Sequence, residues 1–190
     1  MEILFYSATF CLLAFMVLAT YDGFYLHLWK YELFNKRESL FEHKTHTVRA
    51  LLFPLIVWFL FVDTSGIFAF LLGMVLVVID LVVLGIDAYS EKESRTFMGG
   101  LPMWEYIIHL FSNGFHFSAI VLAVVLKFRI IDGQLVYLEH LASSPGKELL
   151  SLISINILPG AILLGLIHLL LLLPKPQFLW HTYRRKINCC

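Results

Sequence analysis

The chain alternates long apolar runs with shorter polar segments. The apolar runs cover about residues 3–20, 46–62, 67–86, 103–128 and 149–173. An α-helix needs about 20 apolar residues to cross a bilayer, so this pattern predicts five membrane-spanning helices. The second run reaches that length only if its helix begins earlier, near His43, and residues 63–66 predict a tight turn after it. Pro54 and Pro159 lie inside runs and predict kinks rather than helix ends.

The composition of the chain supports the same class of protein. Of its 190 residues, 59% are hydrophobic and only 15% are charged. Soluble domains are about 45–50% apolar and about 25% charged, and a soluble domain of this size could not bury the excess. Disordered chains are poor in aromatic and aliphatic residues, so disorder is excluded too. We therefore expect an all-α, multi-pass integral membrane bundle that forms one domain over residues 1–190.

Charge and cysteine content exclude further classes. The formal net charge is zero, which argues against a nucleic-acid partner because such proteins carry a basic face. Cys11, Cys189 and Cys190 match neither a disulfide framework nor a zinc-finger spacing.

The distribution of Lys and Arg predicts the orientation in the membrane. With five spans, one side would hold Lys30, Lys36, Arg37, Lys44, Arg49, Lys92, Arg95, Lys175, Arg184, Arg185 and Lys186, and the other side Lys127, Arg129 and Lys147. Cytoplasmic loops carry the excess of basic residues. We therefore expect the N-terminus outside and the C-terminus in the cytoplasm.

Acidic and imidazole side chains interrupt the third and fourth runs at helical spacing. Asp80 and Asp87 are seven residues apart, on one face of a helix. Glu105, His109 and His116 share one face of the next helix with Ser112. Because a charged side chain at the centre of a span costs about 2.5–3.5 kcal/mol, these residues are expected to face a partner, a cavity or a ligand.

Other spans bring polar groups to the same, cytoplasmic depth. Together they give a predicted set of metal ligands: His43, His46, Asp80, Asp87, Glu105, His109, His116 and His168. Asp22 and His27 are five residues apart, which does not place both on one face of an α-helix, so at most one is expected to face the cluster. Whether Glu42 joins the site stays open at this point, and His140 is placed on the opposite side of the membrane.

Imidazole and carboxylate ligands together suit Zn, Fe or Mn. The set is larger than one tetrahedral zinc needs, which favours two metal ions, and helix bundles with inward Glu and His side chains can hold two irons. The expected function is a di-iron oxidoreductase that acts on a lipid or other hydrophobic substrate and takes electrons from a donor protein. Membrane desaturases and hydroxylases also place histidines at cytoplasmic helix ends, but their HxxxH and HxxHH boxes are missing here.

Three alternatives fit parts of the pattern. A b-type cytochrome would use two His from different helices to bind haem b, but it would leave the embedded carboxylates unexplained. A zinc-dependent intramembrane hydrolase needs three ligands and an activated water. A carrier of metal ions or protons would line its path with the same side chains, although five helices without an internal repeat are few for a transporter.

Overall fold

The computed structural model describes residues 1–62 and 66–188 and is mostly helical. Its helices are α1 (Glu2–Thr20), α2 (Leu40–Val57), α3 (Ile67–Ser94), α4 (Met103–Lys127), α5 (Pro145–Leu170) and α6 (Pro174–Asn188). A π-helical segment (Tyr21–Lys30) and a short 3₁₀ turn (Leu33–Asn35) continue α1, a second π-helical segment (Trp58–Val62) continues α2, and a 3₁₀ turn (Thr96–Met98) precedes α4. A two-stranded hairpin, β1 (Phe128–Ile131) and β2 (Gln134–Tyr137), follows α4. The expected turn at 63–66 lies largely outside the described residues.

Five helical segments are long and apolar enough to cross a membrane. They are Glu2–Asn35, Leu40–Val62, Ile67–Ser94, Met103–Lys127 and Pro145–Leu170. The expected helical character and the five helices of membrane-spanning length are therefore confirmed, and the helices are longer than the apolar runs alone outlined. The helices are longer than the runs because polar residues at their ends continue the helical hydrogen bonding, whereas an apolar run stops before those residues.

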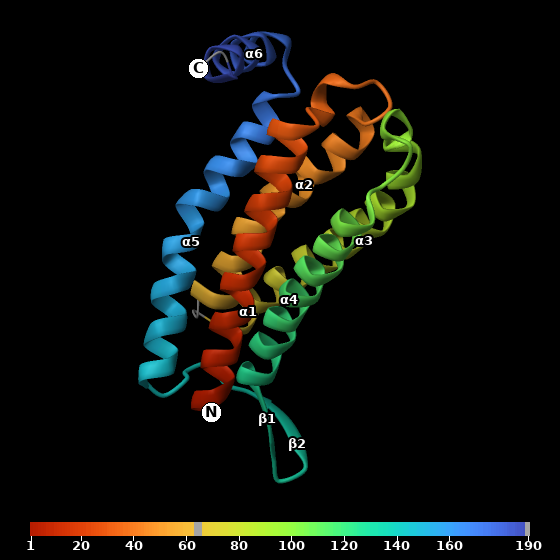
Figure 1. Ribbon diagram of the computed structural model, residues 1–190. Helices are drawn as coiled ribbons and strands as arrows, with labels where there is room; N and C mark the ends of the chain where they lie inside the picture. Colours follow the sequence, from red (N-terminus) through yellow and green to blue (C-terminus); the bar gives the residue numbers. More distant parts are fainter. Residues whose placement is uncertain (63–65, 189–190) are drawn as a thin grey trace.

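The helices pack as a bundle in which α1 contacts α4 and α5, and α2 contacts α3 and α5. Figure 1 shows the N-terminus beside the hairpin and the C-terminus at the opposite end of the bundle. Buried apolar side chains such as Leu12, Ile56 and Ala119 form the centre of the packing. Gly165 of α5 allows a close approach to α2, because a Cβ atom there would lie 2.9 Å from the Ala50 carbonyl oxygen. Small residues have this role in membrane helix pairs generally.

The hairpin is an element that the apolar pattern did not predict. Ile131 pairs with Gln134, so Asp132 and Gly133 form a two-residue loop, and both have positive φ, 51° and 78°. Asp-Gly is a preferred sequence for such a turn because both positions tolerate positive φ. The signal was present in the sequence, flanked by the apolar residues of both strands.

The C-terminal helix α6 lies across the end of the bundle at which α5 finishes (Figure 1). The Trp180 ring makes edge contacts with the rings of Phe24 and Trp29, each with centroids 6.0 Å apart. Arg184 Nη1 lies 2.7 Å from Glu32 Oε1. These contacts attach α6 to the segment that follows α1.

Candidate metal site

The first feature of the site is the π-helical segment that continues α1. Its hydrogen bonds join residues five apart, so side chains at that spacing lie on one face. Asp22 and His27 have this spacing, both are buried, and Asp22 Oδ1 lies 3.3 Å from His27 Nε2. The expectation that at most one of them faces the cluster was wrong, because it assumed α-helical geometry.

Four side chains from two segments converge around this pair. One ligand atom each from Asp22, His27, Glu105 and His109 lies within 4.8 Å of all the others. Asp22 Oδ1 is 3.1 Å from His109 Nε2, and Glu105 Oε1 is 3.8 Å from His27 Nε2. Metal–ligand bonds of about 2.0–2.2 Å separate neighbouring ligand atoms by roughly 3–3.5 Å. The spacing of these atoms is therefore close to that of one coordination sphere.

A second group adjoins the first and shares His27 with it. Ligand atoms of His27, Glu42 and His46 also lie within 4.8 Å of one another. The rings of His27 and His46 meet edge to face with centroids 4.1 Å apart. His46 Nε2 lies 3.1 Å from Asp87 Oδ2, and the Thr45 hydroxyl donates to Asp87 Oδ1. The two groups therefore lie next to each other and share one imidazole.

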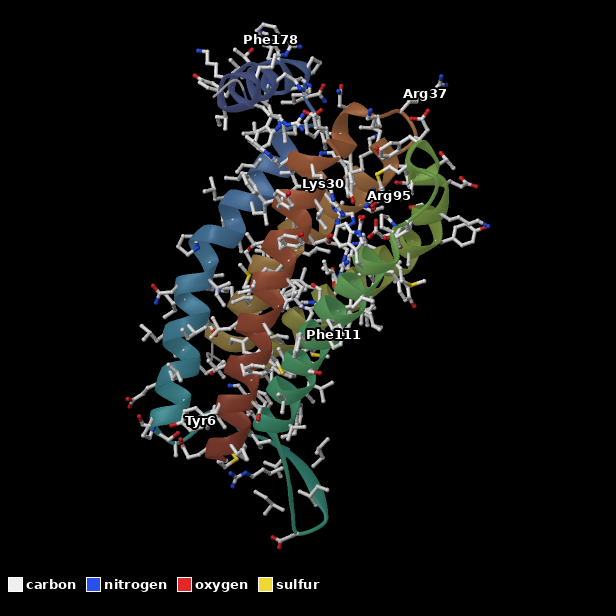
Figure 2. All side chains as sticks on the ribbon, in the orientation of Figure 1. Tyr6, Lys30, Arg37, Arg95, Phe111 and Phe178 are labelled. Carbon is white, nitrogen blue, oxygen red and sulfur yellow. The ribbon has the colours of Figure 1, made fainter. Side chains whose placement is uncertain are left out.

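Arg95, in the connection between α3 and α4, lies between these two groups. Its side chain is fully buried, and its Nη2 atom lies 2.6 Å from Glu105 Oε1, 2.9 Å from Glu42 Oε1 and 3.2 Å from His27 Nε2. Figure 2 shows nitrogen and oxygen atoms gathered beside this residue. The Arg95 guanidinium thus occupies the position beside Glu42 that a metal ion bound by the second group would need. The sequence interpretation treated this connection as a loop and missed Arg95.

The charge of Arg95 is stabilised by its surroundings. Burial disfavours the charged form, but Glu42 and Glu105 outweigh that effect and raise the pKa of the Arg95 guanidinium above its ordinary value. The Ser94 hydroxyl also donates to Glu42 Oε2. Even so, carboxylates outnumber guanidinium groups here. The carboxylates are Asp22, Glu42, Asp80, Asp87, Glu91 and Glu105, and the guanidinium groups are those of Arg49 and Arg95. Protonated carboxyl groups, protonated imidazoles or bound cations can each balance the remaining charge.

Two buried side-chain atoms of the first group, His27 Nδ1 and Glu105 Oε2, lack a hydrogen-bond partner among the described residues. Most buried polar atoms in proteins do have one. His109 differs, since its Nδ1 atom lies 2.7 Å from Glu91 Oε1. A carboxylate on one imidazole nitrogen orients the ring so that the other nitrogen can bind a metal. The donor set therefore fits a metal ion.

Asp80 and His116 form a separate polar group deeper in the bundle. Asp80 Oδ1 accepts a hydrogen bond from Arg49 Nε at 3.1 Å, and Asp80 Oδ2 lies 3.3 Å from His116 Nε2. Arg49 Nη2 also donates to Asn113 Oδ1 at 2.9 Å. Arg49 thus provides the charge compensation that the sequence interpretation assigned to a metal ion. Neither Asp80 nor His116 belongs to the two groups described above.

His43 and His168 form a third pair. Both are buried, their rings stack with centroids 5.3 Å apart, and His43 Nε2 lies 3.1 Å from the His168 carbonyl oxygen. The structure therefore divides the expected ligands among several places. His46, Glu105 and His109 lie in the two ligand groups, and Asp87 contacts His46. Asp80 pairs with both Arg49 and His116, and His43 stacks on His168. Metal binding by any of them stays a prediction.

A cavity of about 270 Å³ connects the first ligand group with the Asp80 group. Its polar wall includes Asp22, His46, Asp80, Asp87 and His109, and its apolar wall includes Phe15, Met16, Phe53, Leu84 and Leu110. A small molecule in this cavity would contact both metal-ligand candidates and hydrocarbon side chains. The arrangement therefore fits chemistry on a largely apolar molecule.

Comparisons with known protein families, with curated proteins and with solved structures find no match for this chain. The geometry of the site is therefore the basis of the functional proposal.

Proposed function

We propose that this protein is a membrane-embedded metalloenzyme, a two-metal, iron-dependent oxidoreductase that acts on a lipid or another hydrophobic molecule. The single observation that carries the proposal is the convergence of Asp22, His27, Glu105 and His109 beside a partly apolar cavity. His27, Glu42 and His46 would hold the second ion once Arg95 has moved away from Glu42. Imidazole and carboxylate ligands suit iron, and the buried excess of carboxylates favours cations.

The residues of the chain have separable tasks in this proposal. Bound iron would supply the one-electron chemistry that dioxygen activation requires. Glu91 would orient the His109 ring through Nδ1, and Arg95 would balance the charge of Glu105. Inserting one oxygen atom from O₂ into a C–H bond releases the other as water and consumes two electrons and two protons. A donor protein would provide those electrons.

We also propose that the polar end of the bundle faces the cytoplasm. This end carries Lys36, Arg37 and the basic residues of α6, and cytoplasmic segments are enriched in Lys and Arg. A reporter fused to the C-terminus should then be cytoplasmic, and one inserted beside His140 should be outside. The reverse pattern would refute this orientation and the access of a cytoplasmic electron donor.

One observation favours a second candidate, a zinc-dependent hydrolase with a single metal ion. Arg95 Nη2 lies 2.9 Å from Glu42 Oε1, the one carboxylate of the second group, so that position would open only if this side chain moved. Arg95 also contacts Glu105 of the first group at 2.6 Å, but Asp22 and His109 remain there as further ligands. The first ligand group would then hold one zinc ion together with a water molecule.

Elemental analysis and an absorption spectrum of the purified, full-length protein test the proposal. We expect iron at close to two ions per chain, and we expect His109→Ala to weaken metal binding by more than about 100-fold. His140→Ala, an exposed histidine at the other end of the bundle, is the matched control and should retain the metal. One zinc per chain would support the hydrolase, a haem Soret band would support a cytochrome, and full metal retention in His109→Ala would refute a metal site here.

A further inference from the structure

The cavity beside the candidate metal site is bounded on one side by α3 and α4, which pack mainly on other helices. α3 packs on α2, α4 packs on α1, and in the described part of the chain α3 and α4 are not among the closely packed helix pairs. Two ion pairs bridge them, Glu91 with His109 at 2.7 Å and Asp80 with His116 at 3.3 Å. Asp80 and Glu91 are 11 residues apart, about 16 Å along α3 at 1.5 Å per residue.

The cavity wall between those two ion pairs includes apolar side chains that are accessible from outside the bundle, beside the polar residues Asp87, Ser112 and Asn113. Leu84 and Ala88 of α3 and Leu110 of α4 line the cavity there. Ala88 is exposed, and Leu110 is 59% exposed although it lines an internal space. Both helices are long and apolar enough to cross a membrane, and Leu84 lies within the apolar run of α3, so we infer that the opening faces lipid chains at Leu84. We call this opening, at Leu84, Ala88 and Leu110, the α3–α4 window.

The size of the cavity restricts what can enter. Its volume of about 270 Å³ is slightly below the roughly 300–1,000 Å³ of pockets that enclose a whole drug-sized ligand. A lipid could therefore place only part of one chain inside, with the rest of the molecule remaining in the bilayer. An opening toward the membrane allows this partial entry, whereas a closed cavity would not.

The lining of the cavity favours a hydrocarbon chain over a charged group. A chain that passes Ala88 and Leu110 meets Phe15, Met16 and Phe53 on the opposite side. Asp22 and His109, members of the first ligand group, line the same space. A headgroup would lose its hydration while passing Leu84, Ala88 and Leu110, because these side chains offer it no hydrogen bonds.

We propose that an acyl chain of a bilayer lipid enters the bundle laterally through the α3–α4 window and lies in the cavity beside Asp22 and His109. Binding of the chain is independent of the metal, and only its role as the substrate rests on the proposed function. The headgroup stays outside, in the bilayer next to α3 and α4.

Photo-crosslinking in nanodiscs tests the window. The probe is phosphatidylcholine with a diazirine in one acyl chain. It is present in phosphatidylcholine nanodiscs that contain the full-length protein. The crosslinked residues are located by peptide mass spectrometry. We expect adducts on the cavity residues Phe15, Met16 or Phe53. Ala88→Trp should lower the yield of these adducts several-fold by filling the window. Val78→Trp, also exposed on α3 but not part of the cavity lining, is the matched control and should leave the yield unchanged.

A second variant keeps the test valid if Ala88→Trp does not fold. Leu110→Ala widens the window and should raise the yield of cavity adducts. Adducts confined to outward residues such as Val78 and Val121, or cavity adducts that neither variant changes, would overturn the proposal.

The His109→Ala variant separates the window from the metal centre. We expect it to lose metal and to retain the cavity adducts. Cavity adducts without bound metal in the wild-type protein would refute the proposed function alone, and bound metal without cavity adducts would refute the window alone.

Discussion

The two ends of the bundle differ in what is buried. At the end beside the hairpin, the core is mostly apolar, with Phe5, Leu12, Phe70, Ala123 and Leu150 (Figure 1). At the opposite end, the buried side chains include Asp22, His27, Glu42, Asp87, Arg95 and Glu105. Replacing buried ion pairs by apolar residues is often neutral or stabilising, so such pairs are weak evidence of a role in stability. This contrast is the reason for which we propose a binding or chemical role for the polar end.

The largest expected effect is on stability at the polar end. Arg95→Met would leave Glu42 and Glu105 buried without their cation, and breaking a buried ion pair in this way costs about 3–5 kcal/mol. We expect a clear drop in the thermal midpoint of the detergent-solubilised protein. Addition of a divalent metal should restore part of the loss if the carboxylates can bind it. Arg129→Met on the exposed strand β1 is the control, and an equal drop there would remove the contrast between the two ends.

The second prediction tests whether the Asp80 group is distinct from the metal ligands. Asp80→Asn keeps hydrogen-bonding capacity but removes the charge that pairs with Arg49 and His116. We expect a loss of about 1–3 kcal/mol of stability, with no change in metal content. Asp132→Asn, an exposed turn residue, should change neither quantity. Loss of metal in Asp80→Asn would place Asp80 among the ligands, as the sequence interpretation had it.

The third effect concerns the carboxylate that holds the His109 ring. Glu91→Gln retains the shape of the side chain but weakens the interaction at Nδ1. Removing such an outer partner typically lowers metal affinity about 10–100-fold. A metal titration monitored by competition with a chelator would measure the change. Glu93→Gln, an exposed neighbour on the same helix, should titrate like the wild type, and an unchanged affinity in Glu91→Gln would argue that Glu91 only bridges α3 and α4.

The smallest effect is expected at the hairpin. Gly133 has φ of 78°, and a residue with a Cβ atom pays about 1–2 kcal/mol in this conformation. Gly133→Ala should therefore loosen the hairpin locally, measurable as faster amide hydrogen exchange in β1 and β2, while metal binding is unchanged. Gly85→Ala of α3 is the control, because a Cβ atom there meets nothing within 4 Å. A change in metal binding in Gly133→Ala would mean that the two ends are coupled.

Some of the site could be anticipated from the sequence because it depends on spacing within one helix. Asp80 and Asp87 share a helix face, as do Glu105, His109 and His116, and these side chains do turn into the bundle. Asp22 and His27 were misjudged because π-helical hydrogen bonding changes which residues share a face. Arg95 was missed because the sequence of a charged loop does not show which of its side chains become buried or which residues they contact. The Asp-Gly turn signal could have identified the hairpin.

The sequence by itself determined that the chain is mostly helical and that five of its helices are long and apolar enough to cross a membrane, because both follow from local composition and periodicity. The tertiary structure alone decided which polar groups meet. Arg49 reaches Asp80, Arg95 reaches Glu42 and Glu105, and Glu91 reaches His109 only through the packing of separate helices. Helical periodicity specifies a direction around one axis, whereas a binding site depends on the distances between axes and on their relative rotation, which packing of the whole bundle sets.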